Sequence, residues 1–202
     1  MPAVRRAHPR LRRLPVPGTV FLNLAYGRES EKLFLAYVAG LLALGLVPKL
    51  ALQVADSGRR LDHIRALLHE CEYSVHDLHH VGEKRWNMIL ELGMAIECSE
   101  KHRWFVLDSQ YRRAIRALSD LNGTDIFEHR GTTAGVFRAL LNIFSRPEQP
   151  LTVTRLEKIL KQFVKQAKKV QRSHKAKSPF ERFVFERLVI EARRLSAPET
   201  QL

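Results

Sequence analysis

The chain has 202 residues, of which 45% are hydrophobic and 27% are charged, and its formal net charge is +13. This length and composition suit one globular domain with an appendage, and they exclude a fully disordered chain. The longest uncharged apolar run, 33–48, is shorter than the roughly 18 residues of a membrane-spanning helix. We therefore expect this run to form a buried helix, and we expect a cytoplasmic protein with no membrane partner.

The positive charge lies at the two ends of the chain. Residues 1–18 carry five arginines and no acid, and residues 151–202 carry 13 lysines and arginines against five acids. The residues between these two segments carry no net charge. We therefore predict a basic flexible tail over 1–18, a neutral domain over 19–147 and a basic helical extension over 151–202.

Strand-like and helix-like patterns alternate along the neutral domain. Short apolar runs bounded by Gly, Pro or Asp predict five strands, at 19–25, 48–55, 72–78, 102–108 and 123–129. The segments between and after them predict helices at 30–45, 59–71, 85–97, 111–121 and 131–144. Ser30 is the expected N-cap of the first helix, and Gly45 is its expected C-terminal stop.

This alternation predicts a doubly wound α/β fold. Strands that alternate with helices of such length form right-handed βαβ units and a parallel sheet covered on both faces. We predict a five-stranded parallel sheet in the order 2-1-3-4-5, which is a flavodoxin-like arrangement.

The basic extension is predicted to be a helical hairpin, with helices at 156–170 and 180–195. The first helix has an apolar seam on one face and lysines on the other. This seam must pack on the second helix, on the α/β core or on another subunit. We favour a protein contact, in a homo-oligomer or with a regulatory partner, and keep nucleic acid as the alternative partner of the lysines.

The polar residues that follow the first three strands predict a ligand site. Ligands of open α/β sheets bind beyond the carboxyl ends of the strands, where the strand order reverses, which is here between the first and third strands. Glu91 interrupts an apolar helical stretch, and Asn87 lies one turn earlier on the same face. The residues expected to line one cleft are Asn23, Tyr26, Ser57, Arg59, Asp77, Asn87 and Glu91.

The segment NMILELG at 87–93 resembles the N-x-x-x-E-L-G motif of TIR-like predicted nucleotide-binding domains. Its ELG part is also similar to a segment of nucleoside 2-deoxyribosyltransferases, and DSGRRLDHI and HECEYSVHDL extend the likeness over most of 19–145. The resemblance implies a TIR-like topology and a glutamate, Glu91, that acts at the anomeric carbon of a ribosyl group. The sequence departs from eukaryotic-type TIR domains, because Trp86 lies five rather than four residues before the glutamate.

The resemblance also implies an activity. We expect an N-glycosidase that cleaves NAD or a related nucleotide as its substrate, with no separate cofactor, in a bacterial defence effector or toxin. A carboxylate can stabilise or attack the oxocarbenium-like state of such a reaction. Asp77 and Asn87 would orient the leaving base, and Arg59 or the amides of the first loop would hold a phosphate.

Simpler interpretations of the same residues stay open. Glu91 could pair structurally with a neighbouring arginine, and Asp77 could only cap a turn. The whole domain could be a non-catalytic nucleotide-sensing or nucleic-acid-associated module. The histidines near Asp77 lack the spacing of a metal site, and we expect no metal. The chain also lacks the glycine patterns of a P-loop and of a dinucleotide fingerprint.

Overall fold

The computed structural model describes residues 14–51, 60–79, 86–98, 102–110, 116, 118–145, 147 and 150–196. The strands in these ranges are β1 (Val16–Asn23), β2 (Val47–Leu50), β3 (Cys71–Asp77), β4 (Arg103–Asp108) and β5 (Ile126–Glu128). The α-helices are α1 (Glu31–Ala43), α2 (Arg60–Glu70), α3 (Trp86–Ile96), α5 (Thr133–Phe144), α6 (Val153–Ser173) and α7 (Arg182–Ser196).

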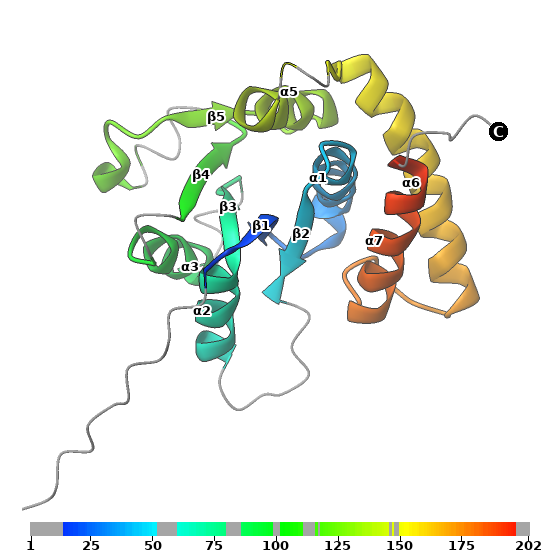
Figure 1. Cartoon of the computed structure of the whole chain (residues 1–202), viewed down its shortest axis with the longest axis horizontal. Helices are drawn as coiled ribbons and strands as arrows, with labels where there is room; N and C mark the ends of the chain where they lie inside the picture. Colours follow the sequence, from blue (N-terminus) through cyan, green and yellow to red (C-terminus); the bar gives the residue numbers. More distant parts are fainter. Residues whose placement is uncertain are drawn as a thin grey trace, which may run out of the picture.

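The five strands form one parallel sheet in the order β2-β1-β3-β4-β5. Helices α2 and α3 cover one face of this sheet, and α1 and α5 cover the other (Figure 1). The predicted flavodoxin-like α/β fold and its strand order are therefore confirmed. The point where the strand order reverses lies between β1 and β3, at their carboxyl ends.

The side chains of β1 alternate between two apolar cores. Val20 and Leu22 pack in the core that contains α1 and α5, whereas Phe21 packs in the core that contains α2. This alternation follows from the two-residue period of a strand, and burial on both faces explains why the strand reads as a continuous apolar run. Asn23 lies two residues after Phe21, so its side chain points to the same face of the sheet, which is the face that α3 covers.

The two ends of α1 lie at the predicted residues, Ser30 and Gly45. Gly45 ends α1 as expected: its φ is +76°, and the amide of Leu46 donates to the carbonyl of Leu41 at 2.9 Å. Ser30 occupies the N-cap position, but its hydroxyl makes no capping hydrogen bond. Its backbone is already helical, whereas a capping side chain needs an extended backbone at that position. Residues 52–55 and most of 111–121 lie outside the described residues.

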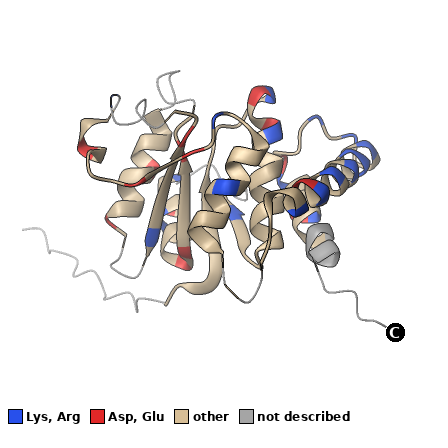
Figure 2. Ribbon diagram, turned by 90° about the horizontal axis from the view of Figure 1, so that it is seen from above, with Lys and Arg blue, Asp and Glu red and all other residues tan. Residues whose placement is uncertain are grey.

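Helices α6 and α7 form a hairpin that packs against α1 (Figure 1). The buried side chains of α6 and α7 belong to the same core as α1 and the sheet; they are Leu156, Leu160, Phe163, Ala167, Val184, Phe185 and Leu188. The apolar seam of α6 is therefore covered within the chain, by α7 and by α1. The lysines of α6 lie on the outside of the molecule (Figure 2).

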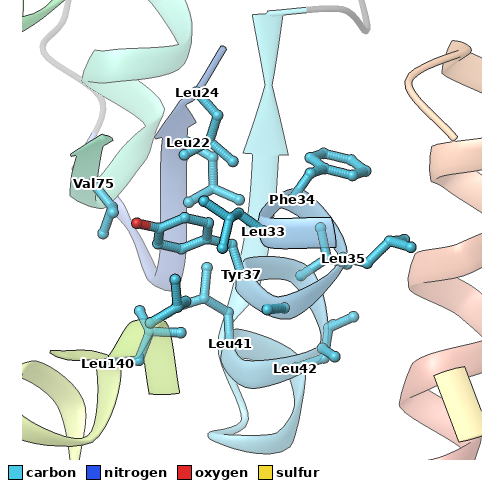
Figure 3. Packing of buried hydrophobic residues seen from close by; sticks show 14 of the residues in the cluster. Leu22, Leu24, Leu33, Phe34, Leu35, Tyr37, Leu41, Leu42, Val75 and Leu140 are labelled. Carbon is cyan, nitrogen blue, oxygen red and sulfur yellow. The ribbon is translucent and has the colours of Figure 1, made fainter. Parts of the chain in front are cut away.

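Helix α1 is apolar on all sides because it is enclosed on all sides. Every residue from Leu33 to Leu42 is buried, between the sheet and the α6–α7 hairpin. The Tyr37 ring lies among leucines, and its hydroxyl points toward Val75 of β3 (Figure 3). The expectation of a buried helix in this run is confirmed. In the described part of the chain, no helix has the length and apolar character needed to cross a membrane.

Candidate functional site

Glu91 lies in the middle of α3, and its side chain is buried although it is ionisable. The residue is only 5% exposed. Asn87, one turn earlier, is exposed and its side-chain amide hydrogen-bonds to the Glu91 carboxylate. The predicted pair therefore shares one face of α3, at the edge of the sheet where ligands of this fold bind.

The surroundings of Glu91 change its acidity. Burial raises the pKa of Glu91 to about 7, although the Arg60 guanidinium and the hydrogen bond from Asn87 both act to lower it. Burial and the charge of Glu91 raise the pKa of Tyr26, while Arg60 again acts to lower it. Tyr26 follows β1 and Arg60 begins α2, so three separate elements bring these groups together around Glu91. At neutral pH the Tyr26 hydroxyl is protonated, and Glu91 is shared between its ionised and neutral forms.

Asn23 anchors α3 to the sheet. Its amide nitrogen donates to the carbonyl of Met88 at 2.8 Å and contacts Nδ1 of His76 at 3.0 Å. Met88 lies in the helical turn before Glu91, and Asn23 is 2% exposed. Asn23 was expected to contact a ligand; in this structure both of its amide hydrogens hold protein groups, and its visible role is to fix the position of α3.

The bond from Asn23 begins a buried hydrogen-bonded chain. His76 Nε2 lies 2.8 Å from the Ser74 hydroxyl, which lies 2.9 Å from His102 Nε2, and His102 Nδ1 lies 3.0 Å from the carbonyl of Cys71. An amide N–H can only donate and a carbonyl oxygen can only accept, so every proton of these hydrogen bonds is assigned: His76 carries its proton on Nε2, and His102 carries its proton on Nδ1. Burial, with the neighbouring His102, lowers the pKa of His76 to about 3, which agrees with a neutral ring.

Asp77 is the last residue of β3, and its side chain lies on the face of the sheet opposite to these hydrogen-bonded histidines. Its carboxylate accepts from the Tyr37 hydroxyl at 3.0 Å, from the His79 amide at 2.9 Å and from His129 Nε2 at 3.2 Å. The amide of Gly131 donates to His129 Nδ1 at 3.1 Å, which leaves the His129 proton on Nε2, facing Asp77. Asp77 is thus held by groups of α1 and of the turn that precedes α5.

These contacts determine the charge of Asp77. Burial alone would raise its pKa, but the hydrogen bonds, led by that of His129, outweigh burial and the pKa is lowered. Successive residues of a strand face opposite sides of a sheet, so His76 faces α3 and Asp77 faces α1. The structure therefore brings Tyr26, Asn87 and Glu91 together, places Asn23 beneath them and sets Asp77 apart.

We expect Asp77→Ala to lower the free energy of unfolding by about 2–3 kcal/mol, because the Tyr37 hydroxyl and the His129 ring would lose a buried ionised acceptor. Urea unfolding monitored by circular dichroism measures this loss. Asp125→Ala, which removes an exposed carboxylate, is the control and should change stability little. Because the Asp77 pKa is lowered from 3.8, its stabilisation should persist above that pH and disappear as the pH falls further. A stability equal to that of the control would contradict a structural role for Asp77.

The remaining predicted site residues, Ser57 and Arg59, lie outside the described residues. Among the described residues, the arginine whose charge acts on Glu91 is Arg60, which the sequence pattern did not single out. Two adjacent arginines at the start of a predicted helix cannot be told apart by pattern alone. His129 was also missed, although the rule that locates sites at the carboxyl ends of strands applies to it, because it directly follows β5.

A small cavity adjoins Asp77 on the α1 face. Its volume is about 10 Å³, enough for about one water molecule, and the buried Ser30 hydroxyl, which lines it, has no hydrogen-bond partner among the described residues. It is too small for a nucleotide. Within the described ranges, no group of three or more His, Cys, Asp and Glu side chains is arranged to hold a metal ion.

Comparisons of the chain with protein-family models, with curated proteins and with solved structures found no match. Support for a function therefore comes from the residues around Glu91 and from their chemistry.

Proposed function

We propose that the protein is a nucleotide N-glycosidase, which cleaves the bond between base and ribose in NAD or a related nucleotide, with Glu91 as the catalytic carboxylate. The observation that carries this proposal is a buried carboxylate with a pKa of about 7 at the carboxyl edge between β1 and β3. A fold gains no stability from burying such a group with little compensation, whereas perturbed carboxylates are common at active sites.

The chemistry of the bond fits the groups around Glu91. When the glycosidic bond breaks, its electron pair leaves with the base and positive charge develops on the ribose, where an ionised Glu91 would stabilise it or form a covalent bond to the anomeric carbon. Water would then supply the hydroxyl group of the product. The positive charge of a nicotinamide ring next to Glu91 would also favour the ionised carboxylate.

Arg60 and Tyr26 have natural roles in such a complex. The Arg60 side chain is exposed, so its guanidinium can form charge-assisted hydrogen bonds to a phosphate. The Tyr26 hydroxyl is protonated and can donate to the ribose or to the base. Asn23 and the histidine chain beneath α3 would act as positioning residues, since they fix the helix and not the substrate.

The direct test is to incubate the purified protein with NAD, with nicotinamide mononucleotide and with deoxynucleosides, and to measure the released base by chromatography. Release from at least one of them, at a rate that rises with protein concentration, is the expected result. Binding of a nucleotide without release of base would contradict the enzyme proposal and favour the alternative, a nucleotide-sensing module. The partly neutral Glu91 is compatible with that role, because a protonated carboxyl group can donate a hydrogen bond to a ligand.

We expect Asn87→Ala to reduce turnover by about tenfold, which is less than the loss expected on changing Glu91. The amide of Asn87 stabilises the ionised form of Glu91, so its removal should also move the acidic limb of the pH–rate profile to higher pH. Steady-state rates measured across pH give both quantities. A tenfold loss with an unchanged pH profile would show that Asn87 contacts the substrate and does not act through Glu91.

A further inference from the structure

Helix α6 presents a continuous basic surface, which we call the basic stripe: Lys158, Lys161, Lys165, Lys168, Lys169 and Arg172. All six side chains are exposed. At about 100° per residue they lie within an arc of about 100°, and at about 1.5 Å per residue the stripe is about 21 Å long. In Figure 2 the ribbon of this helix, at the edge of the molecule, is coloured blue at its lysine and arginine positions.

The charges of the basic stripe are not neutralised by the described part of the protein. No described carboxylate forms an ion pair with any of the six side chains. The single acid of α6 is Glu157. Four of the cations, Lys165, Lys168, Lys169 and Arg172, line an open hollow in the surface. Such a row of unpaired cations is complementary to a chain of regularly spaced negative charges.

The two sides of α6 fit neither a membrane surface nor the core of a protein–protein interface. The arc of the basic stripe is centred about 160° from the arc of the buried residues Leu156, Leu160, Phe163 and Ala167. These side chains pack inside the protein, so α6 has no free apolar face to insert into a membrane, as interfacial helices do. A surface composed mainly of lysines is also unlike the core of a protein–protein interface, where lysine is depleted.

Aromatic rings lie next to the C-terminal end of the basic stripe. The rings of His174 and Phe183 have centroids 4.5 Å apart, and Phe183 is 46% exposed. The guanidinium of Arg187 lies over the Phe183 ring, 5.6 Å from its centroid. An exposed aromatic ring beside a basic surface resembles the arrangement that proteins use to bind single strands, in which cations hold the phosphates and the ring stacks on a base.

We propose that the basic stripe, together with Phe183, binds single-stranded nucleic acid. The stripe would follow the phosphate backbone, and Phe183 would stack on an unpaired base at its end. This inference does not depend on Glu91, because the basic stripe lies on the hairpin outside α1, whereas α3 lies on the far face of the sheet (Figure 1). The two proposals can therefore fail separately.

The first measurement is fluorescence anisotropy with labelled DNA and RNA single strands of about 20 nucleotides and the full-length protein. If about four phosphates are neutralised, affinity should fall roughly 50-fold between about 50 and 200 mM salt. DNA and RNA arms show whether the ribose contributes, and saturable binding with this salt dependence in either arm supports the proposal. Absence of binding at low salt would overturn it.

Charge reversals test whether the basic stripe is the binding surface. The variant Lys165→Glu, Lys168→Glu, Arg172→Glu should lose about tenfold or more in affinity, since it removes three phosphate contacts and adds repulsion. The matched control is Lys32→Glu, Arg65→Glu, Arg138→Glu, which changes the net charge equally at exposed positions outside the stripe. Equal losses in the two variants would show that net charge alone, and not the stripe, attracts the nucleic acid.

A second pair of variants tests the aromatic contact. Phe183→Ala should weaken single-strand binding by about tenfold through lost stacking, and it should have little effect on a duplex of the same sequence. Ile190→Ala, at an exposed apolar position of the same helix, is the control and should bind as the unchanged protein does. Duplex binding that equals single-strand binding would overturn the assignment to single strands. Tighter binding to vesicles that contain phosphatidylserine than to either oligonucleotide would show that the stripe serves a membrane surface instead.

Discussion

Glu91→Gln is expected to reduce base release by about 100-fold or more, because the amide keeps the size of the side chain but cannot carry the negative charge that stabilises a cationic transition state. Chromatography of the released base under single-turnover conditions measures the loss. Glu97→Gln is the matched control: it makes the same change at an exposed position just beyond α3 and should keep full activity. If Glu91→Gln keeps the activity of the control, Glu91 is not the catalytic carboxylate.

The pH dependence of the unchanged protein adds a second measurement on the same residue. Since Glu91 must be ionised to stabilise positive charge, the rate constant kcat/KM should rise with pH and level off above its pKa of about 7. A rate that falls over this range would instead indicate that the protonated carboxyl group is the active form, as in a general acid.

The same substitution should increase stability, and this result separates a functional glutamate from a structural one. The pKa of Glu91 is about 7 in the folded protein, against an ordinary value of 4.5. Between these values the folded state binds more protons than the unfolded state, so the free energy of unfolding falls as the pH rises, by about 3 kcal/mol in total. Glu91→Gln removes this loss. The variant should match the unchanged protein below pH 4.5 and exceed its stability at about pH 8.

Urea unfolding at the two pH values tests this expectation. If Glu91 formed a stabilising ion pair with an arginine, its removal would instead lower stability at high pH. A gain in stability together with a loss of activity is the pattern expected where a protein retains an unfavourable group for function.

The sequence predicted the arrangement of the sheet well because each strand is short, apolar and bounded by turn residues. The rule for the carboxyl ends of parallel strands then placed Tyr26, Asn87 and Glu91 near one another. The same rule could not assign Asp77 to a face. In a strand buried on both sides, hydrophobicity does not show which residues point to which face of the sheet. A shift of the strand register by one residue moves every side chain to the other face.

Other features depended on geometry that a local pattern does not contain. Tyr37 reads as one more apolar residue in α1, and only the folded chain shows that its hydroxyl reaches Asp77. The backbone of Ser30 is helical, which its residue type does not reveal. The seam of α6 was evident from its spacing, but one of its two partners is α1, which lies more than 100 residues away in the chain.

Phe163→Ala is expected to lower the free energy of unfolding by about 3–5 kcal/mol, because it opens a cavity between α6, α7 and α1. Phe163 is fully buried in the core that these helices share with the sheet. Gln162→Ala, at the neighbouring exposed position, is the control and should change stability little. The measurement is urea unfolding followed by far-ultraviolet circular dichroism.

The form of the transition is as informative as its midpoint. Since α1 is enclosed between the sheet and the hairpin, loss of the hairpin would expose the apolar side of α1 to water, and the sheet and hairpin should unfold together in one cooperative transition. Phe163→Ala should therefore shift the whole transition to lower urea. Two transitions, with the second at the midpoint of the unchanged protein, would mean that the hairpin is a separate unit. We expect a chain that ends at residue 150 to lose cooperative folding, because the leucines of α1 lose the helices that cover them. If the hairpin were a separate unit, this shortened chain would stay folded.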